Sequence, residues 1–288
     1  MILIDYSQVA ISNIAVQLAM SKGKNVLSIP MVRHMILNSI RGYVHRFKNE
    51  YGNEVVICVD GPDPWRRDIF EQYKAKRREG RESSSTDWES VFGLIHTIKE
   101  EIRDNFPYKV VQLDKVEADD IIAVICKKHH DKKVLIISGD KDFQQLQKYP
   151  NIHQYSPTKK QFVKTDSPQE YVYEHILKGD TSDGIPNFLS PDDTFVNRIK
   201  QKPVSKKKLA GWIDSLMRGN DPQDFCNEYH YRNFQRNQRL IDFDYIPDDI
   251  ETDIYKQYEK ATVSDRSKIL PYMIKNDLRE LIGKIEEF

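Results

Sequence analysis

The stretch KVVQLDKVEADDIIAVICKKHHDKKVLIISGD, residues 109–140, contains the pattern on which the fold prediction rests. Its two ends, residues 109–113 and 133–138, are short runs rich in Val, Leu and Ile without polar alternation, which is typical of strands covered on both faces. Residues 118–130 between them follow a helical pattern. A strand, a helix and a second strand in this order predict a parallel α/β unit.

The same alternation extends over the first half of the chain. Two more apolar runs of the strand type occupy residues 1–4 and 54–59. Further helical patterns lie at residues 8–20, 31–47 and 87–106. The predicted fold class is therefore α/β, with a mostly parallel central sheet flanked by helices.

The last third of the chain predicts helices instead of strands. After about residue 190 the short apolar runs end. Helix-like segments replace them at residues 207–219, 222–241 and 269–287. Earlier in the chain, the polar, serine-rich stretch RREGRESSST at residues 77–86 predicts a mobile segment.

Composition excludes several classes of protein. The chain has 288 residues, enough for one large domain or two smaller ones, and its 44 basic and 44 acidic residues cancel. No apolar run approaches the roughly 20 residues of a membrane span, and the N-terminus lacks a signal-peptide pattern. The three cysteines, Cys58, Cys126 and Cys226, match no zinc spacing and no disulfide framework. We therefore expect a soluble protein of a reducing compartment, the cytoplasm.

Acidic side chains follow three of the predicted strands, at Asp5, Asp60 and Asp140. Ligands of open α/β sheets bind beyond the carboxyl ends of the strands, so these acids are expected at one edge. The segments VEADD at residues 116–120 and GDTSDG at residues 179–184 bring further acids to the same edge. The complete set of candidate carboxylates is Asp5, Asp60, Glu117, Asp119, Asp120, Asp140, Asp142, Asp180 and Asp183.

Two explanations compete for these acids. A single acid after a strand is more often a turn residue or a helix N-cap, and acids in a first helical turn gain about 0.3–1 kcal/mol from the helix dipole. Capping does not account for five separate segments that end in this way. Mg²⁺ and Mn²⁺ prefer such oxygen ligands, and two ions about 4 Å apart would clamp a phosphate for in-line displacement. Zinc is less expected, because the sequence shows no histidine or cysteine at a zinc-ligand spacing from these acids.

Basic and aromatic side chains are interleaved in WRRDIFEQYKAKRREGR, residues 65–81. This mixture suits single-stranded nucleic acid, with charges for phosphates and rings for bases. A solvated helix that pairs with its own acids is the alternative, but the position after Asp60 places the segment over the acidic edge. The candidate contacts are Arg66, Arg67, Tyr73, Lys74 and Arg77, of which Tyr73, Lys74 and Arg77 would share one helix face.

A second basic run, RIKQKPVSKKK at residues 198–208, has six basic residues and no acid. It could follow a duplex backbone, and a solvated loop is an equally good explanation of it. Metal ions would neutralise the acidic edge, and the two basic segments would hold a polyanion across it. A metal-dependent nuclease needs this arrangement.

Six motifs together resemble the 5′-nuclease superfamily, which includes the flap endonucleases. They read LIDYSQ (3–8), VVICVDG (55–61), WRRD with YKAKR (65–77), VEADDIIA (116–123), SGDKDF (138–143) and GDTSDGIPN (179–187). The motifs occur in the order expected of the family, and the similarity extends through LIDFDYIPDDI (240–250) to the EEF terminus. Each motif alone is weak, but the set is specific. Within the superfamily, the chain looks most like the phage ribonuclease H branch.

The resemblance implies two Mg²⁺ ions, for which Mn²⁺ can be exchanged. It places the first ion among Asp5, Asp60, Asp119 and Asp140, with Asp119 as the best candidate for a direct ligand. It places the second at Asp142 and Asp183, with Glu117, Asp120 and Asp180 in supporting or water-mediated roles. It also implies a flexible arch at residues 65–86, in which Lys74 and Arg77 meet the scissile phosphate and Tyr73 stacks on a base.

The implied activity is 5′→3′ removal of RNA primers from RNA–DNA duplexes, with 5′→3′ exonuclease and flap cleavage on DNA in lagging-strand replication. Residues 1–185 would form the PIN-like nuclease core, and residues 186–288 a mostly helical duplex-binding region, in a monomer. The implied partners are DNA and RNA–DNA duplexes with 5′ ends or flaps. A single-strand-binding protein and a sliding clamp are further candidates, in the cytoplasm of a bacterial host if the chain is phage-encoded.

One segment departs from the family pattern. Much of the superfamily continues from GD..SD.IPG into a glycine-rich hairpin that grips duplex phosphates with the help of a monovalent ion. Here the chain reads NFLSPDDTFVNRIKQKPVSKKK at residues 187–208, without those glycines. Lys206, Lys207 and Lys208 are therefore the candidate replacements as direct phosphate contacts.

Three other functions compete with this one. A small-molecule phosphohydrolase with an aspartate nucleophile would need the second acid of a D-x-D start, which LIDYS lacks, and has no use for a long basic segment. A PIN-type nuclease would be shorter and would lack the helical last third. A nucleic-acid-binding module without catalysis is disfavoured because all the expected carboxylates are present.

Overall fold

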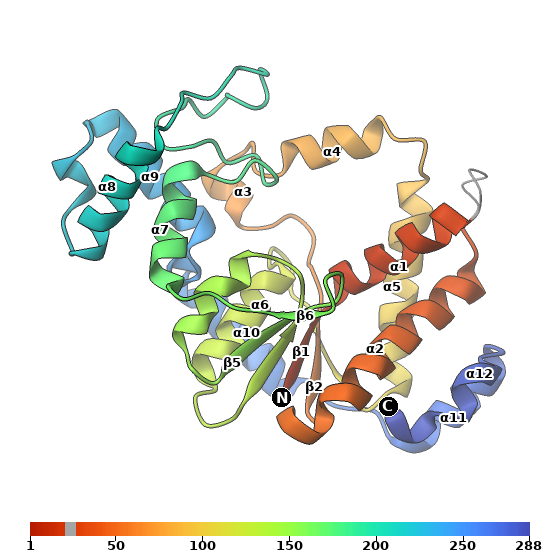
Figure 1. Ribbon diagram of the computed structural model, residues 1–288. Coiled ribbons are helices and arrows are strands. Elements are labelled where there is room, and N and C mark those ends of the chain that lie inside the picture. The colour runs from red at the N-terminus through yellow and green to blue at the C-terminus, as the bar shows by residue number, and fades with distance from the viewer. Residues whose placement is uncertain (21–26) are drawn as a thin grey trace.

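The computed structural model describes residues 1–20 and 27–288. A six-stranded sheet lies at its centre, with the order β3-β2-β1-β4-β5-β6 (Figure 1). The strands are β1 (Ile2–Asp5), β2 (Val55–Cys58), β3 (Lys109–Val111), β4 (Val134–Ile137), β5 (Ile152–Ser156) and β6 (Gln161–Val163). The first five are parallel, and β6 runs antiparallel to β5. The mostly parallel sheet and the four predicted strands are thus confirmed.

Strands β5 and β6 were not predicted from the sequence. Polar residues interrupt the apolar pattern of β5, and one of them, Gln154, is buried all the same. The Gln154 side-chain amide donates to the backbone carbonyls of Ser138 at 3.0 Å and Asp140 at 2.5 Å, which makes its burial tolerable. The short β6 is an edge strand with exposed residues, so it carries no burial pattern.

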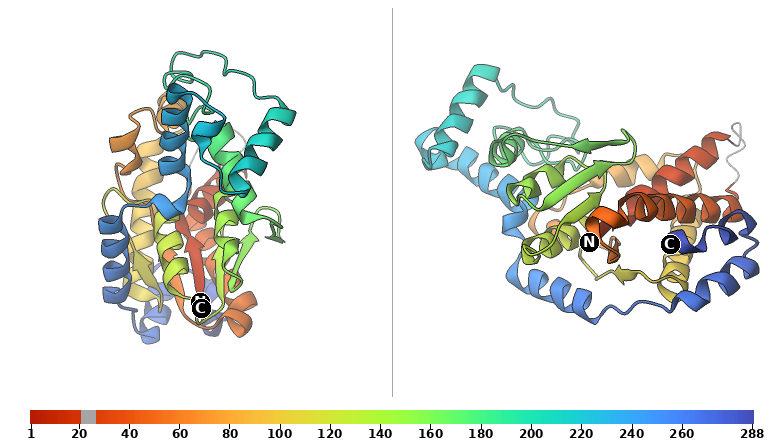
Figure 2. Two further views of the ribbon diagram at one scale, coloured as in Figure 1. Left: turned by 90° about the vertical axis from the view of Figure 1, so that its left-hand side faces the viewer. Right: turned by 60° about the horizontal axis from the view of Figure 1, so that its bottom comes forward.

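Helices cover both faces of the sheet, as Figure 2 shows. Ile2 and Ile4 of β1 belong to one hydrophobic cluster and Leu3 to the opposite one, which explains why the strand has no polar alternation. The first face is covered by α1 (Tyr6–Met20), α2 (Ile29–Tyr51) and α5 (Trp88–Asn105). The second is covered by α6 (Ala118–Lys128), η1 (Asp142–Lys148) and α10 (Asp248–Lys260).

A third hydrophobic cluster lies beside the sheet and holds three helices: α7 (Pro168–Lys178), α8 (Lys206–Met217) and α9 (Glu228–Ile241). Two short helices, α3 (Arg66–Ile69) and α4 (Ala75–Glu82), connect β2 with α5. Phe70 and Tyr73 between α3 and α4 pack into the third cluster. The connection therefore crosses over the carboxyl ends of the strands, where α4 lies in Figure 1.

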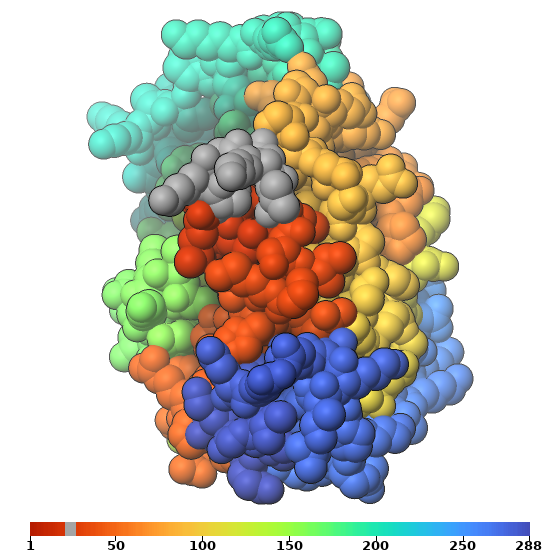
Figure 3. Space-filling view, turned by 90° about the vertical axis from the view of Figure 1, so that its right-hand side faces the viewer, coloured from red at the N-terminus to blue at the C-terminus, as the bar shows by residue number. Residues whose placement is uncertain are grey.

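The end of the chain returns to the first face of the sheet. The predicted continuous helix at residues 269–287 is instead α11 (Ile269–Lys275), α12 (Arg279–Ile282) and η5 (Ile285–Glu287), because Asp277 takes a left-handed φ of 54°. The predicted helix at 222–241 likewise divides into η2 (Pro222–Asp224) and α9, and η3 (Phe243–Tyr245) and η4 (Arg266–Lys268) are short turns. Figure 3 shows the C-terminal residues packed beside α2 and α5. None of the described helices is long and apolar enough to cross a membrane.

Candidate metal centre and nucleic-acid interface

A pocket of about 1080 Å³ opens at the carboxyl ends of β1, β2 and β4, below the segment that contains α3 and α4. Eight of the nine predicted carboxylates line it: Asp5, Asp60, Glu117, Asp119, Asp140, Asp142, Asp180 and Asp183. They come from five separate segments of the chain. The parallel strands thus bring together what the sequence separates by up to 178 positions, from Asp5 to Asp183.

Hydrogen bonds fix the inner acids in place. Asp5 ends β1 and accepts from the Ser138 hydroxyl at 2.9 Å and from the Gln8 amide at 3.1 Å. Asp60 accepts from the Ala118 amide at 2.8 Å, which ties the start of α6 to the end of β2. The amide groups at the start of α6 therefore favour negative charge at this point.

The inner acids repel one another strongly. Burial raises the pKa of Asp5 to about 7, and the nearby Asp60 adds to the effect. Burial and then Asp142 raise the pKa of Asp140 to about 6. The pKa of Asp119 lies well above its usual range because the carboxyl is buried close to Asp140 and Asp5. This centre has too much negative charge for its surroundings, and a cation would relieve it.

The raised pKa values predict how stability depends on pH when divalent ions are chelated. A carboxyl whose pKa is higher in the folded chain than in the unfolded chain, about 4, stabilises the fold at low pH, and this contribution is lost as pH rises through the folded value. The free energy of unfolding in EDTA should thus fall between about pH 4 and about pH 7, from the pKa of an unfolded carboxyl up to the raised pKa values of Asp140 and Asp5. Denaturant titrations measure this.

Adding Mg²⁺ should remove most of that fall, since the ions compete with protons for the same carboxylates. The Asp5→Asn variant should show a flatter profile in EDTA, because it lacks one of the titrating groups. A profile in EDTA that is flat or rises over this range in the unmodified chain would contradict the account of the acidic centre.

Two cations from the arch segment reach the outer acids. The Lys74 ammonium lies 2.5 Å from Glu117 Oε1 and 3.6 Å from Asp183 Oδ2, and the Arg77 guanidinium pairs with Asp183. Burial alone would raise the pKa of Glu117, but Lys74 and Arg66 lower it to about 2. The predicted catalytic residues Lys74 and Arg77 therefore face the acids directly.

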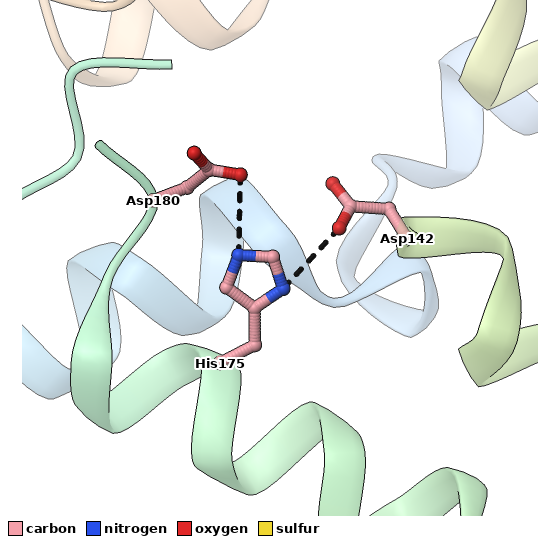
Figure 4. A group of neighbouring side chains, drawn as sticks. All are labelled: Asp142, His175 and Asp180. Carbon is pink, nitrogen blue, oxygen red and sulfur yellow. Dashed lines mark hydrogen bonds and ion pairs between the residues drawn. The ribbon is translucent and has the colours of Figure 1, made fainter. Parts of the chain in front are cut away.

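A histidine that the sequence did not suggest joins the second group of acids (Figure 4). His175 of α7 lies between Asp142 and Asp180, with each ring nitrogen 3.2 Å from a carboxylate oxygen. Burial alone would lower the pKa of His175, but these hydrogen bonds raise it to about 10. Donor atoms of the three residues lie within 4.8 Å of one another and could hold a metal ion. The only sequence signal was the position of His175, near the end of the helix that precedes Asp180.

Asp120 and Arg66 correct two expectations. Asp120 was expected beside the metal ions and Arg66 on nucleic acid, but both are buried, at 0% and 3% exposure. Arg66 donates to both Asp120 oxygens, at 2.7 and 3.0 Å, and Asp120 also accepts from Trp65 Nε1 at 3.0 Å. The Asp120 carboxylate further caps α6 through the Glu117 amide. Successive residues of a helix point in different directions, so Asp119 faces the pocket and Asp120 the interior.

The other predicted nucleic-acid contacts differ in exposure. Tyr73 is only 3% exposed, and its hydroxyl donates to Glu117 at 3.0 Å and Asp183 at 3.1 Å, so its ring offers no free face for a base. Arg67 lines the pocket and pairs with Asp63 at 3.0 Å. The predicted lysines of residues 206–208 form the exposed first turn of α8, outside the pocket lining.

Comparisons with known sequences match the whole chain. Residues 1–176 match the family described as 5′-3′ exonuclease, N-terminal resolvase-like domain, and residues 166–288 match the family described as T4 RNase H, C terminal. The chain is 37% identical over 295 residues to the ribonuclease H of Enterobacteria phage T4, covering 99% of this chain and 95% of that protein. It is 30% identical to a 5′-3′ exonuclease of Buchnera aphidicola subsp. Baizongia pistaciae, covering 52% of this chain and 50% of that protein.

Solved structures share the fold at low identity. The T5 D15 protein co-crystallised with metal ions has a TM-score of 0.58 and 15% identity, covering 99% of this chain and 98% of that one. The T5 5′-exonuclease with bound zinc ions has a TM-score of 0.57 and 14% identity, covering 100% of this chain and 98% of that one. These structures show that the arrangement of sheet and helices is a known one.

Proposed function

We propose that this chain, which belongs to the 5′-3′ exonuclease family, removes RNA primers from RNA–DNA duplexes and acts as a 5′→3′ exonuclease and flap endonuclease on DNA in lagging-strand replication. The observation that carries this proposal is the pocket that gathers eight carboxylates from five segments beneath the basic arch segment. The ribonuclease H of phage T4, which aligns over nearly the full length, supports the substrate class.

The residues fit a pair of divalent ions. Oxygen donors dominate the pocket, and the raised pKa of Asp119 supports a cation at this position. Asp5, Asp60, Asp119 and Asp140 would hold the first ion, and Asp142 and Asp183 the second, with Glu117 and Asp180 in support. When bound, such ions lower the pKa of a water molecule and stabilise the leaving oxygen. Mg²⁺ is the ion we propose, with Mn²⁺ as a substitute.

The chain's own cations would act on the phosphate. Lys74 and Arg77 now neutralise Glu117 and Asp183, and divalent ions at these carboxylates would free both cations to pair with a phosphate entering the pocket. Their charge would stabilise the phosphoryl oxygens as negative charge develops in the transition state. Tyr73 would position Glu117 and Asp183 through its hydroxyl in this state of the protein. No side chain has to act as nucleophile, so 5′-phosphate and 3′-hydroxyl ends are expected.

A 5′-labelled RNA strand annealed to DNA tests the proposal most simply. Short labelled products should appear with Mg²⁺ and should be absent in EDTA. Binding of the hybrid without any product would favour a non-catalytic binding module. Release of phosphate from a small phosphomonoester, with the hybrid left intact, would favour a phosphohydrolase instead.

The duplex would lie along the region beyond residue 186, for which the lysines at 206–208 are the proposed phosphate contacts. Replacing Lys206, Lys207 or Lys208 singly with Gln should lower the slope of log affinity against log salt by about 1. Each variant lacks one lysine charge that would otherwise neutralise a phosphate of the duplex. Filter binding or anisotropy of a labelled duplex at several salt concentrations measures this slope. Lys275→Gln on α11 is the matched control, because Lys275 is exposed and α11 lies far from α8 in Figure 1. An unchanged slope in all three variants would rule these lysines out as phosphate contacts.

The two parts of the chain have different proposed roles. We assign catalysis to residues 1–185 and duplex binding to residues 186–288, in a monomer that works in the cytoplasm of a bacterial host. The third hydrophobic cluster joins α7 of the first part to α8 and α9 of the second, so the two parts would move together. Docking of a single-strand-binding protein or a sliding clamp on the C-terminal helices completes the proposal, and α11 exposes Leu270 and Ile274 there.

A further inference from the structure

The pocket extends beyond the acids to an aromatic wall that the proposed chemistry does not use. Trp88 and Phe92, in the first turns of α5, both line it. Four positions apart on a helix, they share a face, and their ring centroids lie 5.7 Å apart with planes inclined by 31°. Phe92 is 40% exposed, so its ring is open to solvent at the edge of the charged pocket.

Positive charge borders this wall on the side of the arch. The Arg81 guanidinium carbon, at the end of α4, lies 5.2 Å from the centre of the Phe92 ring. Burial lowers the pKa of Arg81, and the neighbouring Arg77 and Arg67 lower it further. Within the described parts of the chain no ion pair involves Arg81, so its charge is not neutralised by an acid as those of Arg67 and Arg77 are.

The wall also carries an unused hydrogen-bond donor. Trp88 Nε1 is shielded from solvent and has no hydrogen-bond partner among the described residues. Tyr73, the ring that the sequence suggested for stacking, is instead occupied with Glu117 and Asp183. Trp88 and Phe92 are therefore the aromatic surface that this pocket offers to a ligand.

We infer that Trp88 and Phe92 form a stacking platform for the unpaired 5′ nucleotides of the substrate, with Arg81 and Arg67 pairing with the phosphates between those bases. The inference rests on the proposed nuclease function and adds the path of the single strand to it. Rings beside arginines, of which Arg81 has no acidic partner among the described residues, suit single-stranded nucleic acid, since rings stack on bases of any sequence while arginines follow the backbone. The platform and the acids belong to one continuous pocket, so a strand on the platform leads to the acidic centre.

The test compares two duplexes that differ only in an unpaired 5′ flap. The full chain is titrated in Ca²⁺, and the flap carries 2-aminopurine, whose fluorescence falls when the base stacks. Trp88→Ala and Phe92→Ala should weaken flap binding by about tenfold or more and reduce the quenching. Both variants should leave the affinity for the flapless duplex within about twofold, since duplex backbone contacts are independent of stacking. Trp88→Phe, which keeps a ring, should retain most of the quenching.

Tyr245→Ala is the control, because Tyr245 is 45% exposed and lies outside the pocket lining. Equal loss of affinity for both duplexes, or unchanged quenching in Trp88→Ala and Phe92→Ala, would overturn the platform. If Trp88→Ala fails to fold, the exposed Phe92 and the conservative Trp88→Phe still decide the matter. If the wild-type chain cleaves flaps, and the variants lose no more affinity for the flap duplex than for the flapless duplex, the platform alone is refuted. A wild-type chain that neither binds nor cleaves either substrate refutes the nuclease proposal itself.

Discussion

Asp119→Asn will lose metal-dependent cleavage by more than about a hundredfold while the chain stays folded. Replacing a residue that only hydrogen-bonds to a metal ligand already costs about 10- to 100-fold, and Asp119 is proposed as a ligand itself. Asp119 lies half-buried in the pocket at the start of α6, near Asp140 and Asp5, where an amide cannot supply the negative charge that a divalent ion requires. Single-turnover cleavage of a labelled RNA–DNA hybrid at saturating Mg²⁺ measures the loss.

The same variant should be more stable than the unmodified chain in EDTA at pH 8. The pKa of the Asp119 carboxyl lies well above its ordinary value in the fold, so at pH 8 this carboxyl costs folding stability that the neutral amide does not. Asp114→Asn serves as the matched control, because Asp114 is exposed in the loop before α6 and outside the pocket lining. Full activity in Asp119→Asn, or an equal loss in Asp114→Asn, would count against the proposed centre.

Arg66→Met will destabilise the fold by about 3–5 kcal/mol, the usual cost of removing one partner from a buried ion pair. Arg66 is 3% exposed and donates to both oxygens of Asp120, to Glu117 and to the Leu240 carbonyl. Its loss leaves the Asp120 carboxylate buried without its cation, close to the acidic pocket. Urea denaturation at neutral pH gives the change in the free energy of unfolding.

The neighbouring arginine provides an internal control. Arg67 pairs with Asp63 at 3.0 Å near the surface, so Arg67→Met should cost no more than about 1 kcal/mol. The double variant Arg66→Met with Asp120→Asn should recover part of the loss, because it removes the unpaired buried charge. Similar costs for Arg66→Met and Arg67→Met would show that the buried network contributes no special stability.

The sequence was informative wherever a residue's type and its position in a simple period agree. The four apolar runs are buried on both faces of the sheet, and their ends carry Asp5, Asp60 and Asp140 into one pocket as the topology requires. The arch cations Lys74 and Arg77 were also expected at this pocket, and the structure places both against its acids. In these cases the residues that are close in the sequence are enough to predict where a side chain points.

The sequence did not predict the surroundings of a side chain where contacts between distant segments determine them. Asp119 and Asp120 are adjacent and chemically identical, and the buried Asp120 carboxylate is held by Arg66 and Trp65 from a distant segment. His175 meets Asp142 across a gap of 33 positions that no local pattern records. Strand β5 has a mixed pattern because Gln154 is stabilised by carbonyls after β4, not by an apolar neighbour. Such pairings exist only in the folded chain.

Counting bound Mn²⁺ tests the central claim, that the acidic pocket holds the ions on which hydrolysis depends. Free Mn²⁺ gives an electron paramagnetic resonance signal that disappears on binding, so a titration of the unmodified chain with a product duplex counts the ions. We predict two ions per chain, one fewer in Asp119→Asn and in Asp183→Asn, and two in Asp114→Asn. An unmodified chain that binds no Mn²⁺, or four proteins that bind the same number, would contradict the account.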